Sequence, residues 1–245
     1  MTKPHVICHM MSPLDGRLHV ESWAKEGSTL YDAVLAEYGR LHTKFNADAW
    51  LAGTTTMTEF AKGKAPKEKT AKEKGSTDNA AKGAAAPPRP WHLADASARH
   101  FAIAIDRKAR LHWDKPVADE GHVVVVLASS VGDDHLAELM DVGVSYLVMP
   151  TDDIDLTKML NDLGQRLNLK KVLLEGGARM NGAFLKAGLV DEISLLLCPA
   201  IDGSSGSPAI FEAGDDGFKE SVKLELMSAD AVKAGAVHMR YKVVK

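Results

Sequence analysis

Strand-like and helix-like segments alternate along most of this chain, and this alternation restricts the possible folds more than any other feature. The predicted strands are residues 5–11, 47–52, 101–105, 122–128, 144–149, 171–174, 192–198, 221–227 and 237–244. The predicted helices run from a cap at Ser28 to Phe45 and over 54–60, 133–141, 155–167 and 178–187, with Asp133 or Asp134 as a second cap. Together they predict one α/β domain over residues 1–245, with a central mixed, mostly parallel sheet flanked by helices. The last two strands have no helix between them, which indicates an antiparallel C-terminal edge.

Charge and cysteine content exclude several classes of protein. Lys and Arg number 30 against 33 Asp and Glu, so the basic excess of a general nucleic-acid binder is missing. The two cysteines, Cys8 and Cys198, exclude a disulfide framework and a cysteine-rich zinc site. The N-terminus lacks the apolar core of a signal peptide, and apolar runs such as 123–128 are too short to cross a bilayer. We therefore expect a cytoplasmic protein that binds neither nucleic acid nor a membrane.

One segment differs in composition from the rest. Residues 61–90 hold seven Lys and one Arg against two Glu and one Asp, with four Pro and no apolar side chain larger than Ala. Such a stretch buries too little surface to offset the entropy cost of ordering it. We predict a low-complexity surface insertion within the domain, spanning residues 61–98. A basic arm for an anion or a nucleic acid is the functional alternative to a solvated loop.

Two predicted strands run into glycine and then into a helix. The first is followed by Glu175, Gly176 and Gly177, and glycine allows a sharp turn and close approach of a ligand to the backbone. The second ends at Gly53 and is followed by residues 54–56, three threonines that can cap the helix or bind phosphate oxygens. A helix N-terminus suits a pyrophosphate, although a structural turn explains each junction alone. Facing one crevice, the two junctions indicate a dinucleotide site.

A third candidate is the loop Ser12–Arg17, directly after the first strand. Asp15 and Gly16 form an ordinary turn pair. The functional alternative is a substrate loop in which Ser12 and Asp15 bind a polar ring.

In this order, the three places resemble the reductase domain of bacterial riboflavin biosynthesis, a family related to dihydrofolate reductase. The matching residues are Ser12-Pro13-Leu14-Asp15-Gly16-Arg17, Gly53-Thr54-Thr55-Thr56, Glu175-Gly176-Gly177 and Gly188-Leu189-Val190-Asp191-Glu192, with a strand running on to Cys198-Pro199. The resemblance covers nearly the whole chain except residues 61–98.

The resemblance implies a dihydrofolate reductase-like fold, NADPH as hydride donor, and a homodimer. It implies a pyrimidine site formed by Ser12, Arg17 and Glu175. It implies cofactor contacts from Trp23, Gly53, Thr54, Thr56, Gly176, Gly177, Ala178, Arg179, Met180 and Asn181. For Trp23, a core position is the alternative to a place beside the nicotinamide.

The implied reaction is reduction of 5-amino-6-(5-phosphoribosylamino)uracil to the ribitylamino compound. The sugar opens to an imine-like form, and its C1′ accepts the hydride. A proton is also needed. Asp15 is the first candidate for acid or orienting group and Glu175 the second, and either can instead anchor the substrate.

Two departures from the family pattern affect the substrate site. The family has Asp-Asp-Pro and then an Arg that binds the sugar phosphate, where this chain has Thr58–Lys62. Arg17, Arg40, Lys62 and Lys64 are the candidate replacements. The family's Lys before the loop is also missing, since Ile7-Cys8-His9 stands there.

Alternatives to this reductase stay open. One is an oxidoreductase of the same fold that acts on another pterin, pyrimidine or imine. Another is a non-catalytic nucleotide-binding protein. The zinc signature of the pathway's deaminase is absent. His5 and His9 lack a third ligand, so we predict no metal site.

Overall fold

The computed structural model describes residues 3–65, 86–219 and 221–244. The strands are β1 (His5–Ser12), β2 (Ala49–Gly53), β3 (Trp91–His92), β4 (Phe101–Ile105), β5 (Val117–Ala118), β6 (Gly121–Leu127), β7 (Ser145–Val148), β8 (Lys171–Leu174), β9 (Glu192–Leu197), β10 (Lys223–Ala231) and β11 (Val237–Val244). The α-helices are α1 (Thr29–Phe45), α2 (Thr54–Met57), α3 (Asp133–Val142), α4 (Leu156–Arg166) and α5 (Ala178–Lys186), with 3-10 turns η1 (Val20–Ser22) and η2 (Lys233–Gly235). No helix in these ranges is long and apolar enough to cross a membrane.

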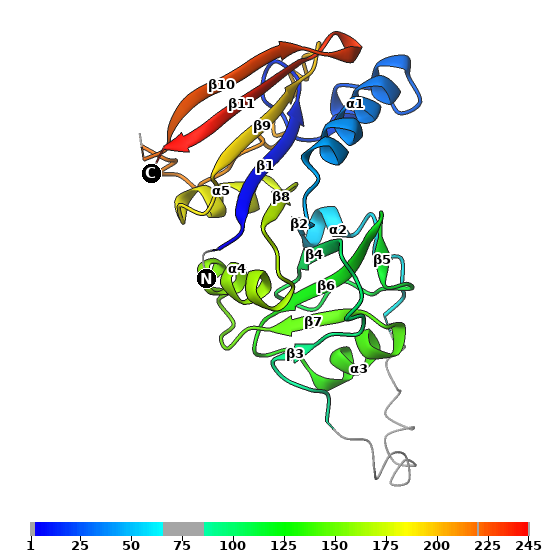
Figure 1. Cartoon of the computed structure of the whole chain (residues 1–245). Coiled ribbons are helices and arrows are strands. Elements are labelled where there is room, and N and C mark those ends of the chain that lie inside the picture. Colours follow the sequence, from blue (N-terminus) through cyan, green and yellow to red (C-terminus); the bar gives the residue numbers. More distant parts are fainter. Residues whose placement is uncertain (1–2, 66–85, 220, 245) are drawn as a thin grey trace.

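The strands form one sheet in the order β10-β11-β9-β1-β8-β2-β4-β6-β7-β3, with β5 paired to β6 (Figure 1). From β9 to β7 all neighbouring strands in this order are parallel. The strands β11, β10, β3 and β5 are antiparallel to their partners. The predicted mixed, mostly parallel sheet with an antiparallel C-terminal edge is confirmed.

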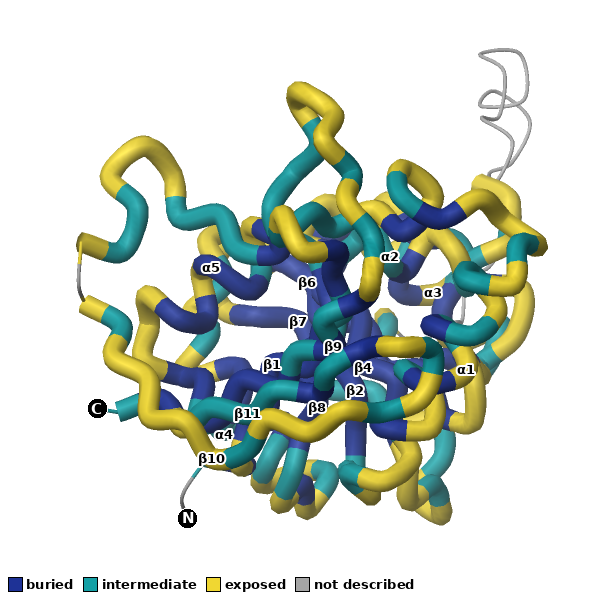
Figure 2. Tube along the Cα trace, turned by 90° about the horizontal axis from the view of Figure 1, so that it is seen from above, coloured by how far each residue is buried: buried dark blue, intermediate teal, exposed yellow. Residues whose placement is uncertain are grey.

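Helices cover both faces of the sheet. Met159 of α4 and Phe184 of α5 pack on one face, and Leu136 of α3 packs on the other, which α1 also covers (Figure 1). Residues 123–126 of β6 alternate between the two apolar clusters, as a strand buried on both faces requires. Figure 2 shows these buried strands at the centre of the molecule, with exposed loops around them.

The helix caps agree with the sequence at α1 and differ at α3. Ser28 Oγ accepts the backbone N–H of Tyr31 at 3.2 Å, which confirms the predicted cap. The expectation of a cap at Asp133 or Asp134 is wrong, because Gly132 is the N-cap and no side chain caps this helix. Both aspartates lie in its first turn, where they still favour the helix dipole.

Three short elements also differ from the prediction. The helix expected over 54–60 ends at Met57. The strands β3 and β5 were not predicted, because two residues give no readable periodicity.

The predicted insertion over 61–98 is only partly open to comparison. Residues 66–85 lie outside the described residues, so the predicted solvated loop and its alternative, a basic arm, both stay untested there. Residues 86–98 contain β3, where Trp91 pairs with Leu147 of β7, and Ser145 Oγ accepts the Ala94 N–H at 2.9 Å. The end of this segment is therefore part of the sheet edge.

Candidate active site

The central strand β8 stops short of both of its neighbours. Leu174 pairs with Cys8 of β1 and Leu51 of β2, and the Glu175 N–H donates to the Leu51 carbonyl at 2.9 Å. β1 continues to Ser12 and β2 to Gly53. The chain therefore leaves the sheet after Leu174, while the strands on either side continue. This is a switch point in the topology, because β8 lies between β1 and β2 although it comes much later in the sequence. Open α/β sheets bind their ligands at such a switch point.

The two glycine junctions face each other at this point, as predicted. A Cβ added to Gly53 would lie 3.5 Å from Met180 Cε, and one added to Gly176 would lie 2.8 Å from Thr56 Oγ1. Gly177 has φ +81°, which favours glycine, and it is the N-cap of α5 without a side-chain cap. Gly176 is buried against Thr56, whereas Gly177 is half-buried and leads into a helix N-terminus, the arrangement that suits a phosphate.

The Thr54 hydroxyl has a structural partner. It donates to the Ile105 carbonyl at 3.1 Å and lies 3.3 Å from Asp106 Oδ1. Asp106 is fully buried and accepts the backbone N–H groups of residues 110 and 111 at 2.6 and 2.7 Å. The Thr54 hydroxyl, which was predicted to bind a phosphate, therefore joins α2 to the end of β4. Thr56, by contrast, lies directly beside Gly176.

The predicted cofactor residues at the start of α5 differ in how far they are exposed. Arg179 is 95% exposed and lies 3.7 Å from Glu212, whereas Ala178 is buried and its carbonyl accepts the Glu212 N–H at 3.0 Å. Asn181 is fully buried and donates from Nδ2 to the Ile210 carbonyl at 2.8 Å. Its Oδ1 is buried without a hydrogen-bond partner among the described residues. Asn181 is thus a link to the segment after β9 that retains one free acceptor.

A cavity of about 800 Å³ lies between α5 and that segment. Of the predicted site residues, Arg179 lines it. The other lining residues are Ala183, Lys186, Phe211, Glu212, Ala213, Gly214, Asp215, Gly217 and Phe218. No motif in the sequence pointed to this cavity.

Asp15 and Arg17 hold two loops together. The Asp15 carboxylate accepts the backbone N–H groups of Asp202 and Gly203 at 3.0 and 2.9 Å, and Arg17 Nη1 donates to the Ser207 carbonyl at 2.6 Å. The hydrogen bonds from Gly203 and Asp202 lower the pKa of the Asp15 carboxyl. A carboxyl with a lowered pKa is ionised at neutral pH, so this geometry favours the anchoring role over that of proton donor.

Ser12 and Trp23 each carry a buried polar atom without a partner in the described part of the chain, Oγ and Nε1. Ser12 ends β1 and, by strand alternation, shares the α4–α5 face with Cys8 and Met10. Trp23 packs on the apolar cluster between α1 and β9, the core position that the sequence left open.

Glu175 points to the opposite face, toward α1. Its Oε1 lies 2.8 Å from His42 Nδ1, and the two side chains are 10% and 34% exposed. The hydrogen bond to Glu175, with its charge, raises the pKa of His42 above its ordinary value. Tyr38 lies one helical turn before His42, and burial and the Glu175 charge raise its pKa. Nothing in the sequence singled out His42, because a histidine on a helix carries no motif.

The His42–Glu175 pair gives stability a pH dependence of known sign. Because the His42 pKa is raised on folding, its contribution is fully present below the unfolded pKa, about 6.5, and is lost as pH rises through the folded pKa. We expect His42→Gln to reduce the free energy of unfolding most below about pH 6.5, the unfolded pKa, and progressively less as the pH rises through the raised folded pKa. Urea denaturation of both proteins across this range measures the difference. A difference that grows with pH would contradict the pairing.

Comparisons with known proteins agree with this geometry. The model of the RibD C-terminal domain matches residues 4–238. A protein of Aquifex aeolicus named 2,5-diamino-6-ribosylamino-4(3H)-pyrimidinone 5′-phosphate reductase is 29% identical over 101 residues, 41% of this chain and 44% of that protein. Its namesake in Methanothermobacter thermautotrophicus is 28% identical over 127 residues, 51% of this chain and 57% of that protein. The chain thus spans about half the length of these relatives.

Solved structures share the fold. A pyrimidine reductase-like protein of Corynebacterium diphtheriae has a TM-score of 0.68 at 21% identity, over 99% of this chain and 92% of that one. The riboflavin biosynthesis reductase of Saccharomyces cerevisiae has a TM-score of 0.58 at 17% identity, over 99% and 90% of the two chains.

Proposed function

The chain belongs to the RibD C-terminal domain family, and from this membership we propose that it is an NADPH-dependent pyrimidine reductase of riboflavin biosynthesis. The substrate we propose is 5-amino-6-(5-phosphoribosylamino)uracil. The observation that carries the proposal is the early end of β8, which leaves Glu175, Gly176 and Gly177 between β1 and β2, opposite Gly53.

A second substrate has support of its own. Two relatives are named as reductases of the 2,5-diamino-pyrimidinone phosphate, which carries a ring amino group where the uracil compound carries a carbonyl. Both substrates share the sugar carbon that is reduced. The same site can therefore bind either substrate. The protein group that contacts the ring amino group or carbonyl decides between the two.

The residues at the sheet edge fit the cofactor. Side-chain-free backbone at Gly176 and Gly177 leads into an uncapped helix of nine residues, which suits a pyrophosphate. The edge continues over β4, β6 and β7 to a cavity of about 360 Å³ that Arg89 and Ser129 line. Three strand spacings separate β2 from β7, about 15 Å, a span that suits an extended dinucleotide. The cation that we propose at that end for the adenosine phosphate is Arg89, which also pairs with Asp133 at 2.8 Å.

The chain's own residues position and protonate the substrate. NADPH, when bound, supplies the hydride that C1′ of the opened sugar accepts. Glu175 anchors the substrate at the end of β8, and the free Ser12 hydroxyl offers a hydrogen bond from the other face. His42 holds a proton at Nδ1 against Glu175, so we assign proton delivery to this pair rather than to Asp15.

The substrate phosphate needs a cation that is not already engaged. Arg40 forms two hydrogen bonds to Glu37, at 2.8 and 2.6 Å, and Arg17 is held by the loop contacts described above. Lys62 and Lys64 are both exposed in the segment that follows α2, and Lys62 Nζ donates to the Thr58 carbonyl at 3.3 Å. Lys62 and Lys64 are therefore the candidates whose charges are most available to a phosphate.

The test is loss of NADPH absorbance with each of the two freshly made substrates, together with direct measurement of NADPH binding. Turnover with either confirms a reductase of this pathway and names its substrate. Tight NADPH binding without turnover on both rejects this substrate class and favours another pterin, pyrimidine or imine. Asp15→Asn should raise KM more than it lowers kcat, because Asp15 holds the loop rather than donating the proton.

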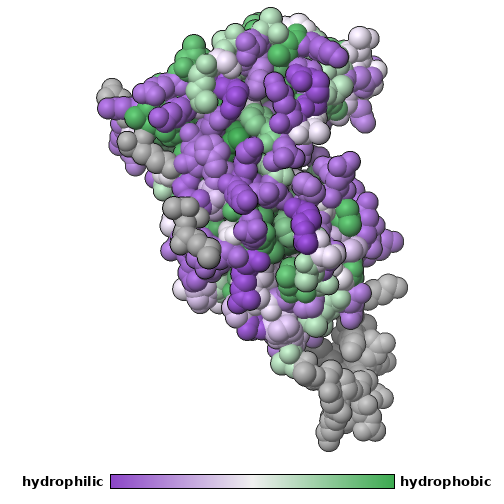
Figure 3. Space-filling view, in the orientation of Figure 1, coloured by the Kyte–Doolittle hydropathy of each residue, from purple (hydrophilic) through white to green (hydrophobic). Residues whose placement is uncertain are grey.

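We also propose a homodimer, in which β10 contributes to the interface. β10 is the C-terminal edge of the sheet, and Leu224, Leu226 and Met227 are 45%, 61% and 51% exposed on it. Figure 3 shows hydrophobic patches among hydrophilic ones at this end of the molecule. An exposed apolar edge strand favours pairing with another chain.

Sedimentation should therefore give twice the monomer mass, and Leu226→Lys should shift the protein toward monomer. Glu225→Lys, one residue away and on the other face of the strand, is the matched control. A wild-type monomer at assay concentration would contradict the proposal. A cytoplasmic location stays a prediction of the sequence.

A further inference from the structure

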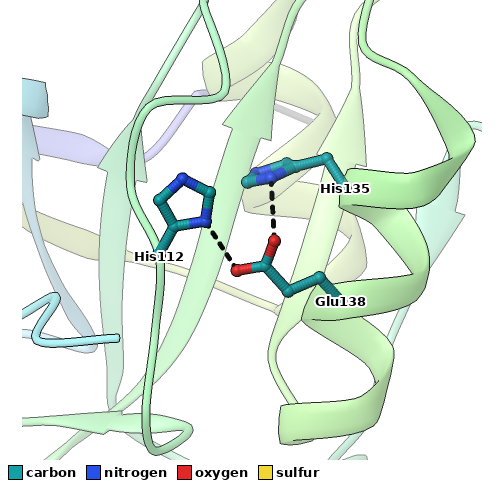
Figure 4. A group of neighbouring side chains, drawn as sticks. All are labelled: His112, His135 and Glu138. Carbon is teal, nitrogen blue, oxygen red and sulfur yellow. Dashed lines mark hydrogen bonds and ion pairs between the residues drawn. The ribbon is translucent and has the colours of Figure 1, made fainter. Parts of the chain in front are cut away.

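Three side chains that bind metals meet beside α3, outside the candidate active site. His135 and Glu138 are one turn apart on this helix, so they project from the same side. His112 reaches them from the connection between β4 and β6 (Figure 4). Glu138 contacts both rings, with Oε1 2.7 Å from His112 Nδ1 and Oε2 3.7 Å from His135 Nδ1.

The separations suit a single ion. One ligand atom from each residue can be chosen so that all three lie within 4.8 Å of one another. Ligands on a tetrahedral zinc ion, with bonds of about 2.1 Å, are about 3.4 Å apart. The side chains would need only small rotations to close around an ion and replace the existing hydrogen bond.

The surroundings also favour a cation. The side chains of His112, His135 and Glu138 are 21%, 10% and 18% exposed, so an ion would be held partly out of water. His135 Nε2 is buried without a hydrogen-bond partner among the described residues. Burial lowers the pKa of His135, and the negative charges of Glu138 and the buried Asp106 act in the opposite direction. Two carboxylates therefore lie near the two imidazoles.

We propose that His112, His135 and Glu138 bind one divalent transition metal ion of the zinc class. Two imidazoles and a carboxylate favour zinc, cobalt or nickel over magnesium and calcium, which prefer oxygen ligands. The three protein ligands leave the fourth position to water. The ion would join the β4–β6 connection to α3 and fix Leu111 and Trp113, the buried neighbours of His112, in the core.

The test uses the full chain, freed of metal with a chelator and titrated with zinc or cobalt. We expect one site, a visible cobalt spectrum typical of tetrahedral coordination, and a rise in melting temperature with zinc but not with magnesium. Glu138→Gln and His112→Ala should each weaken zinc binding by about tenfold or more. His100→Gln removes an exposed histidine elsewhere and should leave zinc binding unchanged.

Equal zinc affinity in the wild type and both cluster variants would overturn the proposal. So would a wild-type protein that gives neither the cobalt spectrum nor the zinc-dependent rise in melting temperature, a result that needs no folded variant. Riboflavin-pathway activity is not part of the readout, so the metal site and the proposed reductase can fail independently.

Discussion

Replacing Glu175 by Gln should lower kcat by about 10²- to 10⁴-fold, the loss expected when a group that positions or transfers the reaction's proton is removed. Glutamine keeps the size of the side chain but removes its charge. Without the charge, the hydrogen bond that raises the His42 pKa is weakened, and the pair no longer holds its proton near the substrate. Stopped-flow and steady-state assays with the active pyrimidine substrate measure the loss.

Two controls separate chemistry from folding. NADPH should bind Glu175→Gln about as tightly as the wild type, because the phosphate contacts we propose come from Gly176, Gly177 and the N-terminus of α5. His42→Gln should lower kcat in the same direction and remove a basic limb from its pH profile. Full activity in Glu175→Gln would contradict the assignment of the proton donor to this pair and leave Asp15 or water as the donor.

Gly182→Ala should destabilise the fold more than its size suggests. A Cβ at this position would lie 1.8 Å from the Glu212 carbonyl oxygen and 2.6 Å from its carbon, so the backbone after β9 must move. That backbone is held to α5 by the Glu212 N–H and by Asn181. Overpacking of this kind costs about 1–3 kcal/mol, or a fall of about 2–12 °C in melting temperature.

Gly39→Ala is the matched control. Gly39 also lies within a helix, but a Cβ there would meet nothing within 4 Å. Alanine should therefore stabilise α1 by about 0.5–1 kcal/mol through helix propensity alone. If both variants gained stability, the contact between α5 and Glu212 would be wrong.

The sequence predicted the elements because their signals are local. The four consecutive valines at 123–126 predict a strand buried on both faces, which the structure confirms, and Ser28 is a cap by its own chemistry. The glycine junctions were also readable, since Gly53 ends one strand and Gly176 and Gly177 lie within three residues of the end of another. The fold class and the meeting of the two junctions are therefore confirmed.

The sequence could not show which partner each side chain takes. Asp15 bonds to the backbone of Asp202, and His42 bonds to Glu175; both partners are more than a hundred positions away. One sequence holds no trace of such pairings. The roles of Ser12, Arg17 and Trp23 in ligand binding, and the phosphate contacts of Thr54 and Thr56, stay predictions.

The place of β8 in the sheet has a consequence for how the chain folds. β1 and β2 come early in the sequence, yet they are joined only through a strand that comes after α4, so the central pairing has high contact order. Until residues 171–174 arrive, β1 and β2 each have an unsatisfied edge, and the turn of Glu175, Gly176 and Gly177 does not yet exist. During synthesis these edges would be exposed to other chains while most of the domain is already outside the ribosome. We therefore expect slow refolding, because β1 and β2 must wait for a strand that is distant in the sequence before either gains its partner at the centre of the sheet.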